Sequence, residues 1–296
     1  MKRARAILVL VMLMSGVVLA QRWGRWGGGE GWLPEDAPVR TARETPSHST
    51  GTPNWTNAPG FEKDVFTFVR VQYQRIFHGM GSRSAGYCFT DYPDSDLNLS
   101  YRLQQMTSLK TDPDGRVLKL TDPDLTHYPW IYMVEAGGLS LRNEEVPILR
   151  NYLLNGGVLM ADDFWGSVQW ATFEREMRRV LPERLFVELP MEHPLFHCVF
   201  DLKGPKNKLQ IPNVGQGARS HYDGITWEFH DGEQCTEMHV RAILDDQGRI
   251  MVIATHNTDN GDGWEREGEE EYFFHEFSEK RAYPLAINII FYLMTH

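Results

Sequence analysis

Ile131-Tyr132-Met133-Val134-Glu135-Ala136-Gly137-Gly138 decides the fold of this chain, because an apolar, strand-like run passes directly into a carboxylate and two glycines. Two other strand-like runs, residues 158–161 and 251–254, also pass into acids, aromatics and glycines. In an open α/β sheet, sites form outside the carboxyl ends of the strands. We therefore expect the three polar tails to meet around one cleft, which is lined by Glu135, Gly137, Gly138, Asp162, Asp163, Trp165, His256, Asn257, Asp259 and Trp264.

Strand-like and helical patterns alternate through the first half of the region that follows residue 63. This alternation is typical of a mainly parallel, doubly wound sheet with helices on both faces. The turn Asp245-Asp246-Gln247-Gly248 between two strand-like runs predicts a β-hairpin extension, and residues 63–296 are expected to form one α/β domain. The predicted strands are 66–73, 131–134, 158–161, 227–229, 240–244 and 250–254, and the predicted helices are 97–109, 143–154, 167–181 and 284–294.

The first 62 residues have two different compositions. Residues 1–20 predict a signal peptide, because basic residues precede an apolar run and Val18-Leu19-Ala20 matches a cleavage site. The run has about 13 residues and a membrane span needs roughly 20, so we expect an exported protein, periplasmic or extracellular, with no transmembrane segment after cleavage. Residues 21–62 are rich in Gly, Pro, Thr and Ser and predict a disordered linker, with a Trp-rich start that could act as a tether.

The net charge of the chain limits the classes of molecule that it is expected to bind. The chain has 30 basic and 40 acidic residues, a formal charge of −10, and signal removal would bring it to about −13. An acidic protein without a basic stripe does not attract nucleic acid. A small molecule, a carbohydrate or an envelope protein remains as a candidate partner.

The three cysteines lack metal-type spacing. Cys88, Cys198 and Cys235 could form one disulfide and leave one thiol, or all three could be small buried side chains. None lies in a strand-to-helix turn, so none is expected to be a nucleophile.

The acidic pair Asp162-Asp163 directly follows a strand, where charges are costly to desolvate unless they face a cleft, a cation or a helix terminus. The pair could hold Mg²⁺ or Ca²⁺, the only cofactors that the sequence suggests. Alternatively, one acid could be a general base with His256 assisting. The structural alternative is that one acid caps the next helix and the other is solvated.

A second acidic cluster consists of Asp91, Asp94 and Asp96. Oxygen ligands at alternate positions are typical of calcium loops, but the glycine and the final glutamate of such loops are missing. The alternative is that Asp96 caps the following helix and Asp94 interacts with its positive end. Elsewhere, Pro194 argues against a helical histidine pair at His193 and His197, and no P-loop or GxSxG motif occurs.

Seven stretches of the chain carry a resemblance to a known family: residues 68–73, 90–98, 153–157, 162–165, 193–197, 256–259 and 263–265. Together they resemble the bacterial domain of unknown function 4159, over about residues 64–296. The resemblance implies a flavodoxin-like sheet of the class I glutamine amidotransferase-like type, related in outline to ThuA-like proteins. Amidotransferases of this type carry a cysteine in a strand-to-helix turn, where this chain has Ala161-Asp162-Asp163-Phe164, so glutamine hydrolysis is not expected.

Three functions follow from these observations. The first is an exported domain that binds a ligand or partner in the cleft, without glutaminase activity. The second is a hydrolase, assisted by a divalent cation, that acts on carbohydrate or a cell-envelope component. The third is a scaffold of an envelope complex, with the Trp-rich segment as its tether.

Overall fold

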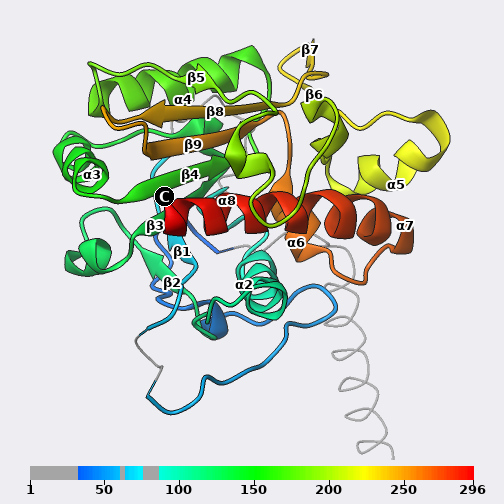
Figure 1. Ribbon diagram of the computed structural model, residues 1–296, viewed down its shortest axis with the longest axis horizontal. Helices are drawn as coiled ribbons and strands as arrows, with labels where there is room; N and C mark the ends of the chain where they lie inside the picture. The colour runs from blue at the N-terminus through cyan, green and yellow to red at the C-terminus, as the bar shows by residue number, and fades with distance from the viewer. Residues whose placement is uncertain (1–32, 61–63, 76–86) are drawn as a thin grey trace, which may run out of the picture.

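The computed structural model describes residues 33–60, 64–75 and 87–296. Its centre is a mainly parallel sheet of seven strands in the order β2-β1-β3-β4-β9-β8-β5 (Figure 1), so the predicted α/β class is confirmed. Strands β2, β1, β3, β4 and β9 pair in parallel, whereas β8 runs antiparallel to its neighbours β9 and β5. The strands are β1 (Val69–Val71), β2 (Arg116–Leu118), β3 (Trp130–Val134), β4 (Val158–Asp162), β5 (Val187–Glu188), β8 (His239–Leu244) and β9 (Ile250–His256).

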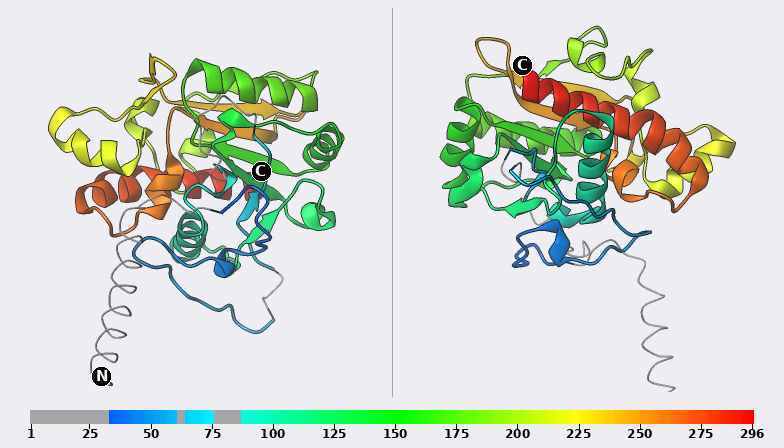
Figure 2. Two further views of the ribbon diagram at one scale, coloured as in Figure 1. Left: turned by 180° about the vertical axis from the view of Figure 1, so that it is seen from behind. Right: turned by 60° about the horizontal axis from the view of Figure 1, so that its bottom comes forward.

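Helices cover both faces of this sheet (Figures 1 and 2). On one face, α3 (Glu145–Leu154) and α4 (Gly166–Val180) pack on one apolar cluster. On the other, α2 (Asp94–Met106), α6 (Asn260–Glu265) and α8 (Tyr283–Thr295) pack on a second cluster. The remaining elements are α5 (Val214–Asp223), α7 (Glu271–Phe273), the π-helical Phe274–Ala282, the pair β6 (Phe229–His230) and β7 (Glu233–Gln234), and short 3₁₀ turns at Ala42–Glu44, Tyr87–Phe89, Pro123–His127, Ala136–Gly138, Pro194–Phe196 and Lys206–Leu209.

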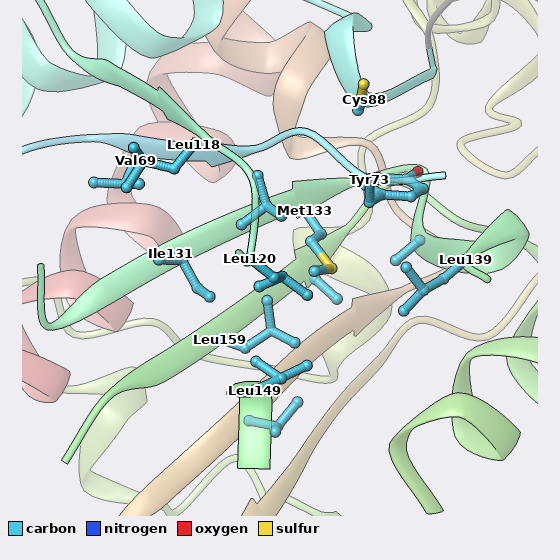
Figure 3. Packing of buried hydrophobic residues seen from close by; sticks show 14 of the residues in the cluster. Val69, Tyr73, Cys88, Leu118, Leu120, Ile131, Met133, Leu139, Leu149 and Leu159 are labelled. Carbon is cyan, nitrogen blue, oxygen red and sulfur yellow. The ribbon is translucent and has the colours of Figure 1, made fainter. Parts of the chain in front are cut away.

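Strand β3 shows how one apolar sequence builds both clusters. Ile131 and Met133 point into the cluster with α3 and α4, where they lie near Leu149 and Leu159 (Figure 3). Trp130, Tyr132 and Val134 belong to the opposite cluster. Successive side chains of a strand point to opposite faces, so a strand buried on both faces is apolar throughout.

Two expected elements differ from the structure. Helix α2 begins at Asp94, three residues before the expected 97, so the acidic cluster lies inside its first turn. The segment after β9 contains α6, to which the sequence analysis assigned no helix. Among the described residues, no helix is both long and apolar enough to cross a membrane.

The described part of the expected linker, residues 33–60, packs on the domain. Ala37 and Ala42 are buried in the core, and Gln72 Nε2 donates to the carbonyl oxygens of Glu35 and Ala37, at 2.5 and 3.0 Å. Trp55 Nε1 donates to the Thr111 carbonyl at 3.1 Å. The composition of this segment predicted disorder. Scattered small and aromatic side chains nevertheless anchor it to the domain, and their spacing in the sequence shows no helical or strand period. The expected signal peptide 1–20 and the Trp-rich stretch 21–32 lie outside the described residues.

Candidate functional site

A cavity of about 330 Å³ lies at the carboxyl ends of the parallel strands. From β1 the chain passes to β2 on one side, whereas β3, β4 and β9 follow on the other, and such a reversal leaves a crevice between the connections. The cavity is therefore where topology alone would place a ligand. It is lined by Arg75, Thr90, Asp91, Glu135, Gly138, Asp163, Trp165, Gln169, Asn213, Glu228, His230 and Asp259.

Four non-glycine residues near these strand ends have left-handed backbone. Their φ angles are 62° at Asp91, 49° at Glu135, 52° at Asp163 and 60° at Asn257. Glu135, Asp163 and Asn257 each come directly after a strand, so each turns the chain sharply as it leaves the sheet. Such a conformation costs on the order of 1–3 kcal/mol for a residue other than glycine and clusters at functional sites. Three of the four line the cavity.

Asp163 is a buried carboxyl group surrounded by other acids. Burial raises its pKa well above the ordinary value, and the nearby carboxylates of Glu135, Asp91 and Glu228 raise that pKa further. Trp165 Nε1 donates to Asp163 at 2.9 Å, and the Trp165 ring stacks on His230 with 5.6 Å between ring centres. Asp163 therefore occupies the sharp strand-to-helix turn as a buried carboxyl group with a raised pKa, and Trp165 holds it in place.

Its neighbour Asp162 faces the start of α6. One Asp162 oxygen accepts from the Asn260 and Gly261 amides, at 3.1 and 3.2 Å, and from the Tyr132 hydroxyl at 3.2 Å. The other accepts from Thr255 Oγ1 at 2.5 Å and Asn260 Nδ2 at 2.7 Å. Burial raises the pKa of Asp162 to about 6 despite these bonds. Asp162 thus positions α6, and it is not among the cavity-lining residues.

Three more acids meet where α6 begins. Asp91, Asp259 and Asp262 each offer an oxygen within 4.8 Å of the others. Asp259 accepts from the Asp262 amide at 2.8 Å, and burial together with neighbouring carboxylates raises its pKa. A Cβ atom at Gly261 would overlap the Asp91 carboxylate, so only glycine permits this approach. Sequence-predicted Asp91 and Asp259 are thereby brought to one wall of the cavity.

The other members of the second acidic cluster point elsewhere. Asp96 forms a buried ion pair with Arg70, whose Nε lies 3.1 Å from both carboxylate oxygens. Asp94 accepts from the Ser47 hydroxyl and, at 3.2 Å, from the His48 amide. Neither caps α2 through its side chain, since α2 has no side-chain cap.

The remaining predicted residues lie around the cavity rather than in its lining. His256 Nε2 donates to the Gly166 carbonyl at 3.0 Å, and burial lowers the pKa of His256 to about 3, so the ring is neutral. Asn257 accepts from the Gly166 amide at 2.8 Å. Trp264 is buried in the core against Tyr132. Gly137 lets its turn approach Gln169, a lining residue, at a distance that a side chain would block.

Sequence reasoning missed half of the lining. Arg75, Thr90 and Gln169 follow or flank predicted elements without any pattern of their own. Glu228 accepts from His230 Nε2 at 2.7 Å and from the Asn213 amide at 2.6 Å. The alternation of Glu228 and His230 in a strand-like stretch was a usable signal, because residues two apart share a face.

Comparison with known proteins gives a family and no characterised relative. No curated protein matches this chain. The family model described as "Domain of unknown function (DUF4159)" matches residues 67–294, which include all strands and every cavity-lining residue. The chain therefore belongs to the DUF4159 family.

Proposed function

We propose that this protein is an exported ligand-binding domain of the flavodoxin-like, class I glutamine amidotransferase-like type, without glutaminase activity. The parallel strands β2-β1-β3-β4-β9 correspond, numbered along the chain, to the order 2-1-3-4-5 of flavodoxin-like sheets, which supports this fold assignment. In that fold ligands bind at the switch between the first and third strands, where Asp91 and Glu135 line the cavity. Export is tested by sequencing the mature N-terminus, which should be Gln21.

The charge of the lining indicates the ligand. Among the described lining residues, five are acids, Asp91, Glu135, Asp163, Glu228 and Asp259, and a single one, Arg75, is an arginine or lysine. Carboxylates accept hydrogen bonds from hydroxyl and ammonium groups and repel anions. The ligand that fits is a small polyhydroxylated molecule with positive charge, such as an amino sugar. The excess of carboxyl groups is the observation that carries this proposal.

The thiols support the absence of glutaminase activity. None of the three cysteines lines the cavity, and all three are free. Burial raises the pKa of Cys88 to about 12 and also raises the pKa values of Cys198 and Cys235. A thiol of high pKa provides little thiolate, which is the nucleophilic form.

Calorimetry with glucosamine, glucose and glucuronate tests the proposed ligand class, because these sugars differ mainly in charge. We expect glucosamine to bind most tightly and glucuronate least. Asp163→Asn should reduce the preference for glucosamine, whereas Asp246→Asn, on an exposed turn, should not. A preference for glucuronate, or no binding of any of the three, would contradict the proposal.

A second candidate is a hydrolase assisted by a divalent cation, favoured by the approach of Asp91, Asp259 and Asp262. Under this hypothesis, Ca²⁺ or Mg²⁺ raises the melting temperature and EDTA lowers it. Asp259→Asn should remove that response. Identical melting curves with Ca²⁺, with Mg²⁺ and with EDTA would contradict the hydrolase hypothesis and would not affect the ligand-binding proposal.

A further inference from the structure

We propose that His48, Asp94 and Glu265 form a binding site for a divalent transition metal such as Zn²⁺, separate from the acidic cavity. The three residues come from the segment before the sheet, the first turn of α2 and the end of α6. One ligand atom of each lies within 4.8 Å of those of the other two. Side chains from such distant parts of the chain converge only because the fold holds them there.

The histidine is oriented as a metal ligand would be. His48 Nε2 lies 2.8 Å from the Tyr92 carbonyl oxygen, which can only accept, so Nε2 carries the hydrogen. In the neutral ring the lone pair is then on Nδ1, which lies 3.1 Å from Glu265 Oε1. A carbonyl that holds the distal nitrogen is the usual support of a metal-binding histidine.

Two acceptors that face each other at 3.1 Å need a proton or a cation between them. The Glu265 side chain is fully buried, and no donor from the described part of the chain reaches either of its oxygens with hydrogen-bond geometry. Oε2 lies 2.6 Å from Arg266 Nε in an ion pair. A cation bound between His48 Nδ1 and Glu265 Oε1 would satisfy both acceptors.

The mixed donor set favours zinc over calcium or magnesium. Imidazole nitrogen is a ligand for zinc, whereas calcium and magnesium select oxygen ligands. Bond lengths of about 2.0–2.2 Å place two ligands of tetrahedral zinc about 3.3 Å apart, close to the observed separation of Nδ1 and Oε1. The His48 side chain is 26% exposed and both carboxylates are buried, so an ion can enter from solvent and keep a water as its fourth ligand.

Zinc would bond to His48 and to carboxylate oxygens of Glu265 and Asp94. Glu265 Oε1 lies 3.1 Å from His48 Nδ1, and Asp94 Oδ2 lies 3.7 Å from His48 Nε2. The metal would also link the segment around His48 to α2 and α6, so it should raise the melting temperature.

The test uses the full chain and zinc alone as the probe, with metal content measured after dialysis. We expect about one zinc per chain, and His48→Gln should weaken binding by more than about 100-fold, since even supporting residues of zinc sites contribute 10- to 100-fold. His275→Gln is the matched control, because His275 is exposed and pairs with Glu279. The mostly buried Glu265 has its own variant, Glu265→Gln, and the more exposed His48 decides if that variant fails to fold.

Two outcomes would overturn the zinc site: no zinc in the wild-type protein, or zinc retained by His48→Gln. The variant Asp163→Asn distinguishes zinc binding at this site from zinc binding in the cavity. It should leave zinc binding unchanged. If Asp163→Asn abolishes zinc binding and His48→Gln does not, the metal lies in the cavity and this proposal is wrong. Sugar binding measured in His48→Gln reports on the proposed function independently.

Discussion

Asp162→Asn should change the pH dependence of stability and leave the fold intact. The asparagine carbonyl can replace the oxygen that accepts from Tyr132 and from the Asn260 and Gly261 amides. Its amide group would face Asn260. The Oδ1 atom of Asn260 has no hydrogen-bond partner among the described residues, and it becomes the acceptor when that side chain turns over. The Thr255 hydroxyl keeps its bond to the Ala161 carbonyl at 3.2 Å.

The expected magnitude follows from the pKa of Asp162. Its folded-state pKa is about 6, above the ordinary 3.8, so the folded state binds more protons between these values. Stability is therefore lost as pH rises through this window, and the full penalty above it is about 3 kcal/mol, at about 1.4 kcal/mol for each pKa unit. Between about pH 4.5 and about pH 7.5, the wild type should lose about 2 kcal/mol relative to Asp162→Asn, which cannot titrate there.

Urea unfolding of both proteins at the two pH values measures this difference. Groups that do not sense the charge of Asp162 titrate alike in both proteins, so their contributions cancel, whereas the adjacent Asp163 loses one of the charges that raise its pKa. Asp246→Asn is the control, because the Asp246 side chain is 86% exposed and Arg184 lowers its pKa. If the wild type instead gains stability relative to Asp162→Asn as pH rises, the five hydrogen bonds outweigh desolvation and the reasoning fails.

Three other perturbations have defined outcomes. Gly261→Ala should destabilise the protein by about 1–3 kcal/mol in urea unfolding, because the new Cβ overlaps Asp91, and it should also weaken binding of the sugar ligand. Arg70→Leu should cost about 3–5 kcal/mol, since it leaves the Asp96 carboxylate buried without its cation. Native protein should react slowly with a thiol reagent near about pH 8, since burial raises the pKa of every thiol, and all three cysteines should react once urea unfolds the chain.

Matched variants separate these effects from general damage. Gly215→Ala lies in α5, where the nearest atom to a new Cβ is Asn213 Oδ1 at 3.3 Å, and it should change stability by less than about 1 kcal/mol. Arg150→Leu removes an exposed pair with Glu183 and should cost less than about 1 kcal/mol. Equal losses in Arg70→Leu and Arg150→Leu would contradict the role of burial, and rapid native labelling would contradict the thiol prediction.

The sequence predicted the edge of the sheet at which the cavity lies because parallel strands bring their carboxyl ends together. It did not separate the roles of Asp162 and Asp163, which are adjacent in sequence and turn to opposite sides of the β4 end. The Arg70–Asp96 pair joins a strand to a helix across a segment without periodic pattern. Such long-range pairings depend on tertiary packing, which local propensity does not encode.

The predictions about the N-terminal region were limited for a different reason. A composition rule treats residues 21–62 as one segment that buries too little apolar surface to order itself. In the structure, its described part is ordered by contacts with the domain. Ala37 and Ala42 are buried in the domain core, and Arg43 donates to the carbonyl oxygens of Pro113 and Pro53. A segment that folds on a preformed surface needs few anchoring side chains. Its sequence therefore shows no periodic apolar pattern from which its order could be predicted.

The residues matched by the family model do not include all the contacts that anchor the domain. The match begins at residue 67, but the Gln72 side-chain amide, directly after β1, donates to the carbonyl oxygens of Glu35 and Ala37. A polypeptide that starts at residue 67 would uncover an apolar seam beside β2 and lose those acceptors. Recombinant versions of such domains should start upstream of residue 33 if they are to remain soluble and protease-resistant.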